Sequence, residues 1–412
     1  MYFIPQAATN EIEYLITTFK KIIEWKTLET RLNDLNRQSQ GVHSFYIKDR
    51  FHIELTLLEI FKYYKNTGRY PWSASPAQHK AYSFITMVVK VYEQLSNKGK
   101  IRLKGMLRNS LNKDYGFNPL AFEMLVATNL MQSGFDVDFT DLEGKERFDF
   151  LATKNGKSLE VECKFISADI GRKIHQKKLH DLASHLQKTI DSHRKNTREN
   201  ILVSIELEDR LNQEQINKIL PNLPKALNNL NTLVQLKDLS IRAENFSEQE
   251  SPFRHEVNID NLRKFVKSKL KIENPHAFIS YNPNHNAFVL SANSKRPDQV
   301  LETIFSKLLE DSKSQLSKQR PSLVCAFLAD ITEEQLLLMH KEQKQKNIGL
   351  QIISNKILER RPHVHTLAFM AEGSVFKSKL GNLTSYRHQG SVFSFTNPQH
   401  PSAQDEDFKI YK

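Results

Sequence analysis

Apolar positions in the first part of the chain recur at the spacing of a helix. Between Ile12 and Ile23 they lie three and four positions apart, and the same period returns over 53–64 and 80–95. Residues at this spacing form one face of an amphipathic helix. The pattern therefore predicts a helical segment that extends to about residue 115.

The pattern changes after residue 117. Asn118 is expected to cap the backbone N–H groups of a helix start, Pro119 suits the first helical position, and Gly134 is typical of a helix end. This predicts a helix over 118–133. Strands are predicted at 135–139, 147–153 and 158–166. Asn155-Gly156 favours a two-residue hairpin between the last two. A long helix over 172–197 and a strand over 201–206 complete this part.

The remaining pattern indicates further strands and helices. Residues 243–260 are polar and predict a loop, and the segments 278–281 and 287–290 predict a hairpin. Strands are expected at 323–328 and 366–370. The polar tail after Phe395 is expected to be loose. We expect an α/β or α+β protein with a mixed sheet. Its predicted divisions are a basic helical domain (1–117), a larger domain with insertions (118–395) and a loose tail (396–412).

Composition adds a preference for polyanions. The 412 residues carry a net charge of +12, and residues 1–117 hold 18 Lys/Arg against 10 Asp/Glu. A basic surface favours nucleic acid or an anionic membrane face. No apolar run approaches the roughly 18 residues that span a bilayer, and no signal peptide is seen at the N-terminus. We therefore expect a cytoplasmic protein with no membrane partner.

Acidic and basic side chains stand together on the predicted strand 158–166. Glu160, Glu162 and Lys164 alternate along it and share one face. Asp149 lies on the preceding strand, between two phenylalanines, and cross-strand neighbours come within about 5 Å. The hairpin therefore predicts that Asp149 converges with Glu162 and Lys164, or with Glu160 if the register slips.

This combination suits phosphodiester cleavage. One or two carboxylates with waters bind Mg²⁺, and the metal polarises a phosphoryl oxygen and lowers the pKa of bound water. A lysine beside it can neutralise charge that develops in the transition state. The alternative is a solvated strand face with a salt bridge and no catalytic role.

The predicted helix 118–133 carries a second clue. Glu123 lies in the middle of its apolar arc, where a lone carboxylate is costly unless it is paired, hydrogen-bonded or bound to a metal. We expect it to be an additional carboxylate near the metal. The alternative is a buried glutamate bridged to a local lysine.

Together these features resemble the PD-(D/E)xK nuclease superfamily, which has a restriction-endonuclease-like core of a mixed sheet flanked by helices. The resemblance covers about 118–207, and Val161-Glu-Cys-Lys164 looks like the motif of Mrr-type restriction endonucleases. It implies Asp149, Glu162 and the backbone carbonyl of Cys163 as ligands of Mg²⁺ (or Mn²⁺), and Lys164 as the catalytic lysine. Phe148 stands where the family pattern has proline.

The resemblance implies an Mg²⁺-dependent DNA endonuclease, with restriction or antiviral defence as a role by analogy alone. One site per chain suggests a homodimer for double-strand breaks. The chain has no nucleotide-driven motor motif, so any ATPase or other defence subunit would be a separate chain. An RNase on the same scaffold and a non-catalytic nucleic-acid-binding protein remain alternatives.

Two basic segments are candidates for DNA contact. Lys100, Arg102 and Lys104 belong to a run over 98–113 without an acidic residue. Charged and apolar positions alternate over 100–104, so this stretch could lie along a phosphate backbone. Arg172, Lys173 and Lys177 open the predicted long helix. Contacts with phosphates are expected at both segments, and a solvated surface is the alternative.

Overall fold

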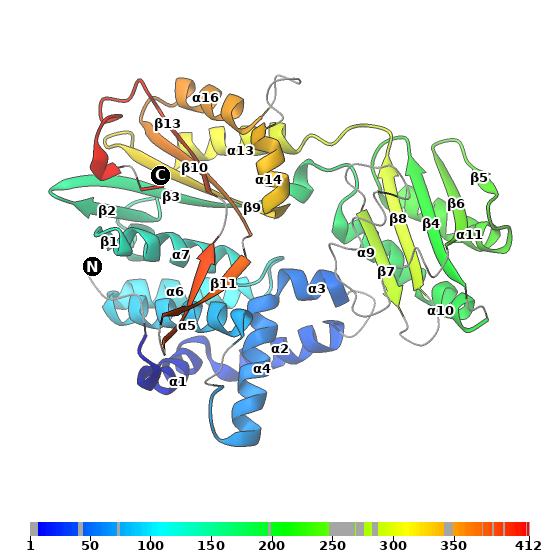
Figure 1. The fold of residues 1–412 in the computed structure, drawn as a ribbon, viewed down its shortest axis with the longest axis horizontal. Coiled ribbons are helices and arrows are strands. Elements are labelled where there is room, and N and C mark those ends of the chain that lie inside the picture. The colour runs from blue at the N-terminus through cyan, green and yellow to red at the C-terminus, as the bar shows by residue number, and fades with distance from the viewer. Residues whose placement is uncertain are drawn as a thin grey trace. The chain divides into compact units, whose positions relative to one another are not determined.

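The computed structural model describes residues 7–39, 44–71, 75–196, 199–246, 268, 276–281, 287–341, 349–372, 374–380, 383–389, 392–408 and 410–411. The chain forms two compact units, whose elements are labelled in Figure 1. The first unit contains Met1–Asn36, Arg50–Ala168 and Leu301–Lys412. The second contains Arg37–Asp49 and Asp169–Val300.

The chain begins with a series of helices, as the apolar period predicted. They are η1 (Thr9–Glu11), α1 (Ile12–Ile23), α2 (Trp25–Ser39), α3 (Ser44–Arg50), α4 (His52–Thr67), α5 (Pro76–Gln94), α6 (Asn97–Ser110) and α7 (Asn118–Gln132). A capping box of Ser75 and Gln78 starts α5. The expected Asn118 cap of α7 is wrong, because the Asn118 amide donates instead to the Arg50 carbonyl at 2.9 Å.

The first unit contains a mixed six-stranded sheet in the order β1-β2-β3-β9-β10-β13. Its strands are β1 (Asp136–Asp138), β2 (Phe150–Lys154), β3 (Lys157–Ser167), β9 (Ser322–Thr332), β10 (Val364–Glu372) and β13 (Val392–Thr396). β3, β9 and β10 run parallel, and the outer pairs are antiparallel. The predicted turn joins β2 and β3, with positive φ at Asn155 (51°) and Gly156 (77°), a conformation that suits these two residue types.

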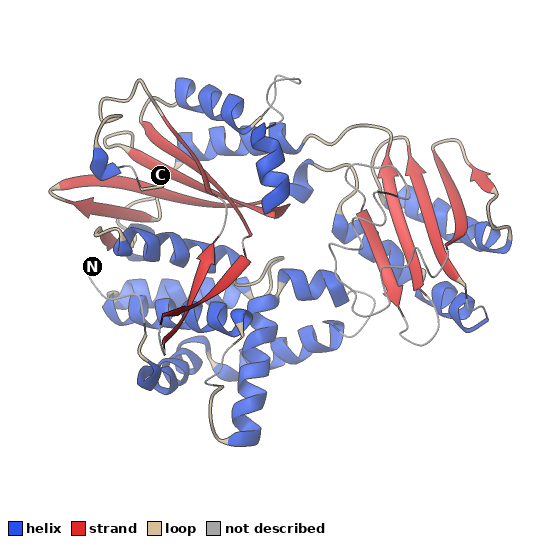
Figure 2. Ribbon diagram, viewed as in Figure 1, coloured by secondary structure: helices blue, strands red, loops and turns tan. Residues whose placement is uncertain are grey.

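Helices lie on both sides of this sheet (Figure 2). The group α5, α6 and α7 lies on one side. On the other lie α13 (Val300–Ser314), α14 (Glu333–Lys341) and α16 (Leu350–Arg360). The short helix α8 (Thr140–Glu143) connects β1 to β2, and β11 (Ser374–Leu380) pairs with β12 (Leu383–Gln389).

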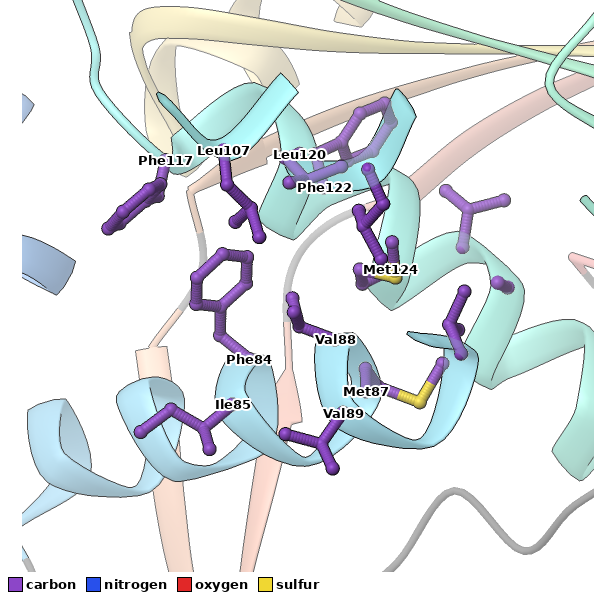
Figure 3. Packing of buried hydrophobic residues seen from close by; sticks show 14 of the residues in the cluster. Phe84, Ile85, Met87, Val88, Val89, Leu107, Phe117, Leu120, Phe122 and Met124 are labelled. Carbon is purple, nitrogen blue, oxygen red and sulfur yellow. The ribbon is translucent and has the colours of Figure 1, made fainter. Parts of the chain in front are cut away.

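The N-terminal helices and the sheet share one hydrophobic core (Figure 3). Phe84 and Val88 of α5 face Leu107 of α6 and residues of α7 that include Leu120 and Met124, and all of them are buried. Burial of each large apolar side chain stabilises the fold by about 1.5–3 kcal/mol. Helices and sheet therefore stabilise each other, and the division of the chain at residue 117 into a helical domain and a larger domain stays a prediction.

The second unit has a mixed five-stranded sheet in the order β5-β6-β4-β8-β7. Its strands are β4 (Asn200–Leu207), β5 (Leu233–Gln235), β6 (Leu239–Phe246), β7 (His276–Tyr281) and β8 (Ala287–Ser294). Its helices after residue 168 include η2 (Ala168–Gly171), α9 (Gln176–His185), α10 (Gln187–Asn196) and α11 (Gln213–Asn228). The predicted hairpin is present as the antiparallel pair β7–β8, although its turn at 282–286 lies outside the described residues.

The predicted long helix over 172–197 is wrong in its bounds. The carboxylate of Asp169 accepts from the backbone N–H of Gln176, so α9 begins only at Gln176. The chain then turns at Leu186, which is buried in the core of the second unit with Leu182 and Ile190. Two shorter helices, α9 and α10, replace the single one.

Two further expectations are corrected. Residues 243–246 belong to β6 rather than to a loop, because they pair with β4, whereas 247–260 lie outside the described residues. The tail is not loose over its described part. The Asn397 N–H donates to the His365 carbonyl at 2.8 Å, Lys157 contacts Asp405 at 2.7 Å, and Phe408 is buried. A hydrogen bond, an ion pair and the buried Phe408 side chain thus hold the polar C-terminal segment in place.

Among the helices that the structure describes, none combines the length and the apolar composition of a membrane span.

Candidate active site

The end of the β2–β3 hairpin brings the two predicted carboxylates together. Phe150 is paired with Val161, so Asp149, one residue before β2, lies opposite Glu162. The backbone N–H of Cys163 donates to Asp149 Oδ2 at 2.6 Å. This hydrogen bond lies just beyond the last β2–β3 backbone pair, Phe150–Val161, and it holds the Asp149 carboxylate against β3.

Lys164 lies on the same face of β3 as Glu162. Its Nζ is 2.5 Å from Glu162 Oε1 and 2.8 Å from Gln315 Oε1, and 4.0 Å from Asp311 Oδ2. The Glu162 side chain is 2% exposed and that of Lys164 is 15% exposed. The structure thus brings Asp149, Glu162 and Lys164 together as expected from the hairpin.

The surroundings of Asp149 and Glu162 disfavour a full negative charge on both carboxylates at once. Burial raises the pKa of Asp149 to about 6, against the bond from Cys163 and the charge of Lys164. Burial and then the charge of Asp149 raise the pKa of Glu162 to about 8. Burial works against the charge on Lys164, but Glu162 and the nearby acids outweigh it and raise its pKa. A cation at this pair would allow both carboxylates to ionise.

Glu123 on α7 belongs to the same electrostatic environment. Burial, followed by the negative charges of Asp149, Glu162 and Asp141, raises the pKa of Glu123 well above its usual range. The expected lone carboxylate is therefore near the other two acids, and the short helix α8 adds Asp141 to the group.

Glu160 has a different role from Glu162. Its side chain is fully buried, and its carboxylate accepts from the Ser317 backbone N–H at 2.9 Å and from the Ser317 hydroxyl. Arg320 lies 3.3 Å from the same carboxylate. These contacts engage Glu160 with the segment after α13, which leaves Glu162 as the acid opposite Asp149.

The donor set fits a divalent cation. Glu162 Oε2 is buried and has no hydrogen-bond partner among the described residues. In a strand the N–H and C=O of one residue point to the same edge, so the Cys163 carbonyl points towards the Asp149 edge. The described residues contain no ready cluster of three His, Cys, Asp or Glu ligands. Mg²⁺ needs only one or two carboxylates, because waters and substrate oxygens complete its shell.

The first predicted basic segment is helical rather than extended. Lys100 and Lys104 lie one turn apart on α6, and their Nζ atoms stand 5.5 and 5.6 Å from the centre of the Tyr92 ring. Arg102 lies on another face and donates to the Asp141 carbonyl. Lys100 and Lys104 thus share one side of α6, while Arg102 connects α6 to α8.

The second basic segment belongs to the second unit and is mostly buried. Arg172 is 8% exposed and Lys173 is 9% exposed, and the Lys173 Nζ lies 3.4 Å from Asp209. Lys177 is exposed at the start of α9. Contact of these three residues with DNA stays a prediction, and the burial of the first two makes Lys177 the most accessible.

Asp311 and Gln315 were not predicted from the sequence. They follow each other by one helical turn at the end of α13, where the Gln315 N–H donates to the Asp311 carbonyl at 3.1 Å. An Asp in a polar helix end is an ordinary surface pattern. Only the tertiary fold shows that this turn meets Lys164.

Comparisons with models of protein families, with curated proteins and with solved structures found no match for this chain.

Proposed function

We propose that this chain is an Mg²⁺-dependent nuclease that hydrolyses phosphodiester bonds of DNA. The observation that carries the proposal is the pairing of Asp149 and Glu162 across the end of the β2–β3 hairpin, with Lys164 on the same face. The buried, unpartnered Oε2 of Glu162 supports it, because an isolated buried carboxylate oxygen is costly without a cation.

Each residue has a distinct role in this proposal. Asp149, Glu162 and the Cys163 carbonyl would hold Mg²⁺ or Mn²⁺, which polarises the phosphoryl oxygen and lowers the pKa of a bound water. The Lys164 ammonium neutralises negative charge that develops on the phosphate, at a site shielded from solvent where such charge pairing is strong. Glu123 supplies a further carboxyl group beside the two ligands.

DNA is preferred as the substrate because of the resemblance to the Mrr-type motif and because the chain is basic, with a net charge of +12. A chain with one such site cuts one strand at a time, so double-strand cleavage would need a homodimer or sequential nicking. Restriction or defence, with or without a separate ATPase subunit, remains an analogy to the superfamily.

The test is a cleavage assay on supercoiled plasmid, linear duplex, single-stranded DNA and RNA, each with Mg²⁺, Mn²⁺ or EDTA. The proposal expects metal-dependent DNA cleavage that EDTA abolishes. Metal-dependent cleavage of RNA alone would select the RNase, and metal-independent binding without cleavage of any substrate would select the binding protein.

A further inference from the structure

The ammonium group of Lys164 lies between three oxygen-bearing side chains. It contacts Glu162 at 2.5 Å and Gln315 at 2.8 Å, while Asp311 Oδ2 lies 4.0 Å away. Glu162 belongs to β3, whereas Asp311 lies in the last turn of α13 and Gln315 follows that helix directly. Lys164 is therefore placed between the candidate metal ligand and a helix from a distant part of the sequence.

Asp311 has a carboxylate oxygen that could accept a further hydrogen bond. Its Oδ2 atom is buried and has no hydrogen-bond partner among the described residues, although the side chain as a whole is 21% exposed. A buried carboxylate oxygen without a partner is costly. The cation that lies nearest to this atom in the ion pairs of the described residues is Lys164.

Metal binding would create a conflict at Glu162. A divalent cation and the Lys164 ammonium would then share one carboxylate at short range, and like charges repel strongly where water is excluded. A lysine has a flexible four-carbon stem and can exchange partners within its reach. Gln315 already holds Lys164 on the α13 side, one turn from Asp311.

We propose that Asp311 is a positioning residue that accepts the Lys164 ammonium from Glu162 when a divalent cation binds. The transfer removes the ammonium group from the Glu162 carboxylate, whose other oxygen has no hydrogen-bond partner in the described part of the chain, and keeps the lysine charged at the site. This inference rests on the proposed function, because it requires that Asp149 and Glu162 bind a metal. It assigns α13, which the superfamily resemblance over 118–207 does not include, to the control of metal affinity.

The test is calorimetric titration of the metal-free full chain with Mn²⁺ in the absence of DNA. Four proteins are compared: wild type, Asp311→Asn, Lys164→Ala and the double variant. Asp311→Asn should weaken Mn²⁺ binding by about 10-fold, the lower end of the usual effect of residues behind a metal ligand, because Lys164 stays on Glu162. In the Lys164→Ala background the same substitution should have little effect, because no lysine remains to be moved.

An equal loss of affinity in both backgrounds would overturn the inference, because Asp311 would then act as a general negative charge or a structural group. Unchanged affinity in Asp311→Asn would overturn it as well. Glu310→Gln is the matched control, since this neighbour on α13 is exposed and the change in charge is the same. Asp311→Glu, which keeps the carboxylate, should bind Mn²⁺ with an affinity close to that of wild type.

Thermal unfolding checks that each variant is folded, and Asp311→Ser replaces Asp311→Asn if the amide prevents folding. Wild type that binds no Mn²⁺ would remove both the proposed function and this inference. Wild type that binds Mn²⁺ without coupling between Asp311 and Lys164 would remove the inference alone.

Discussion

Asp149 accepts a hydrogen bond from the backbone of Cys163 at 2.6 Å, at the point where β2 begins and its ladder with β3 ends. The bond orients one oxygen of the aspartate towards β3 and holds the carboxyl group beside Glu162. The Asp149 carboxylate is thus fixed by the backbone rather than by a long, flexible side chain, which is the precision that a metal site needs.

Glu160 and Glu162 should respond oppositely to the same substitution. Glu160→Gln should lower the free energy of unfolding by about 1–3 kcal/mol, because the buried contacts to Ser317 and Arg320 lose a charged acceptor. Glu162→Gln should leave stability unchanged or raise it, because it removes a buried carboxyl group whose ionisation is disfavoured by burial and by the charge of Asp149. Urea unfolding measures both, and a larger loss in Glu162→Gln would contradict these roles.

Glu123 should affect metal affinity rather than folding. Glu123→Gln removes an acid near Asp149 and Glu162, so it should raise the Mg²⁺ concentration for half-maximal cleavage by about 10-fold, as residues behind a metal ligand do. Cleavage rates measured across a Mg²⁺ titration give this value. A curve that matches wild type would mean that Glu123 is only structural.

Glu54 should make stability depend on pH away from the candidate site. It is fully buried and accepts from the Phe117 N–H at 2.6 Å, and burial raises its pKa from 4.5 to about 8. A raised pKa in the folded state means that the stabilising contribution is complete below pH 4.5 and is lost as pH rises through about 8.

Glu54→Gln keeps an acceptor for Phe117 and cannot ionise. The free energy of unfolding of wild type, relative to this variant, should therefore fall as pH rises from about 5 to about 8. Urea unfolding at both values, in EDTA, measures the difference. A constant difference would show that Glu54 is already ionised in the folded protein over this range, as it is in the unfolded chain, and that its pKa is not raised.

Lys100 and Lys104 should contribute to DNA binding as a pair, while Arg102 should act through α8. Each phosphate contact adds roughly 0.9 to the slope of log affinity against log salt concentration, so Lys100→Gln/Lys104→Gln should flatten the slope by about 2 units. Arg102→Gln should weaken the α6–α8 contact instead.

Fluorescence anisotropy with labelled duplex DNA at several salt concentrations measures these slopes. Lys62→Gln/Lys65→Gln on α4 is the matched control, because both lysines are exposed and the change in net charge is equal. Equal slopes in wild type and Lys100→Gln/Lys104→Gln would place the DNA contact elsewhere.

The sequence predicted those parts of the fold that local pattern determines. The apolar period gave α1, α4, α5 and α7, and Asn155-Gly156 gave the hairpin whose register places Asp149 opposite Glu162. Alternation along β3 placed Lys164 on the face of Glu162. Asp149, Glu162 and Lys164 all lie on or next to one hairpin. Their proximity therefore follows from local sequence pattern, and a single sequence was enough to predict it.

Long-range pairing could not be predicted. The strand after the predicted long helix, β4, joins the sheet of the second unit, and the parallel neighbour of β3 is β9, with Cys163 opposite Cys325. Local sequence pattern does not indicate which strands pair when, as for β3 and β9, more than one hundred residues separate them. Asp311 was missed for the same reason, since its contact with Lys164 exists only after β9 and α13 have packed.

The decisive experiment on the metal site compares Mg²⁺-dependent cleavage of supercoiled plasmid by wild type and by folded Glu162→Gln. Wild type should nick or linearise the plasmid with Mg²⁺ and not with EDTA. The variant, with a native unfolding transition, should lose at least about 100-fold in rate because a metal ligand is gone. Asp149→Asn and Lys164→Ala should lose comparable activity. Full activity in folded Glu162→Gln would contradict the assignment of the Asp149–Glu162 pair as the metal site.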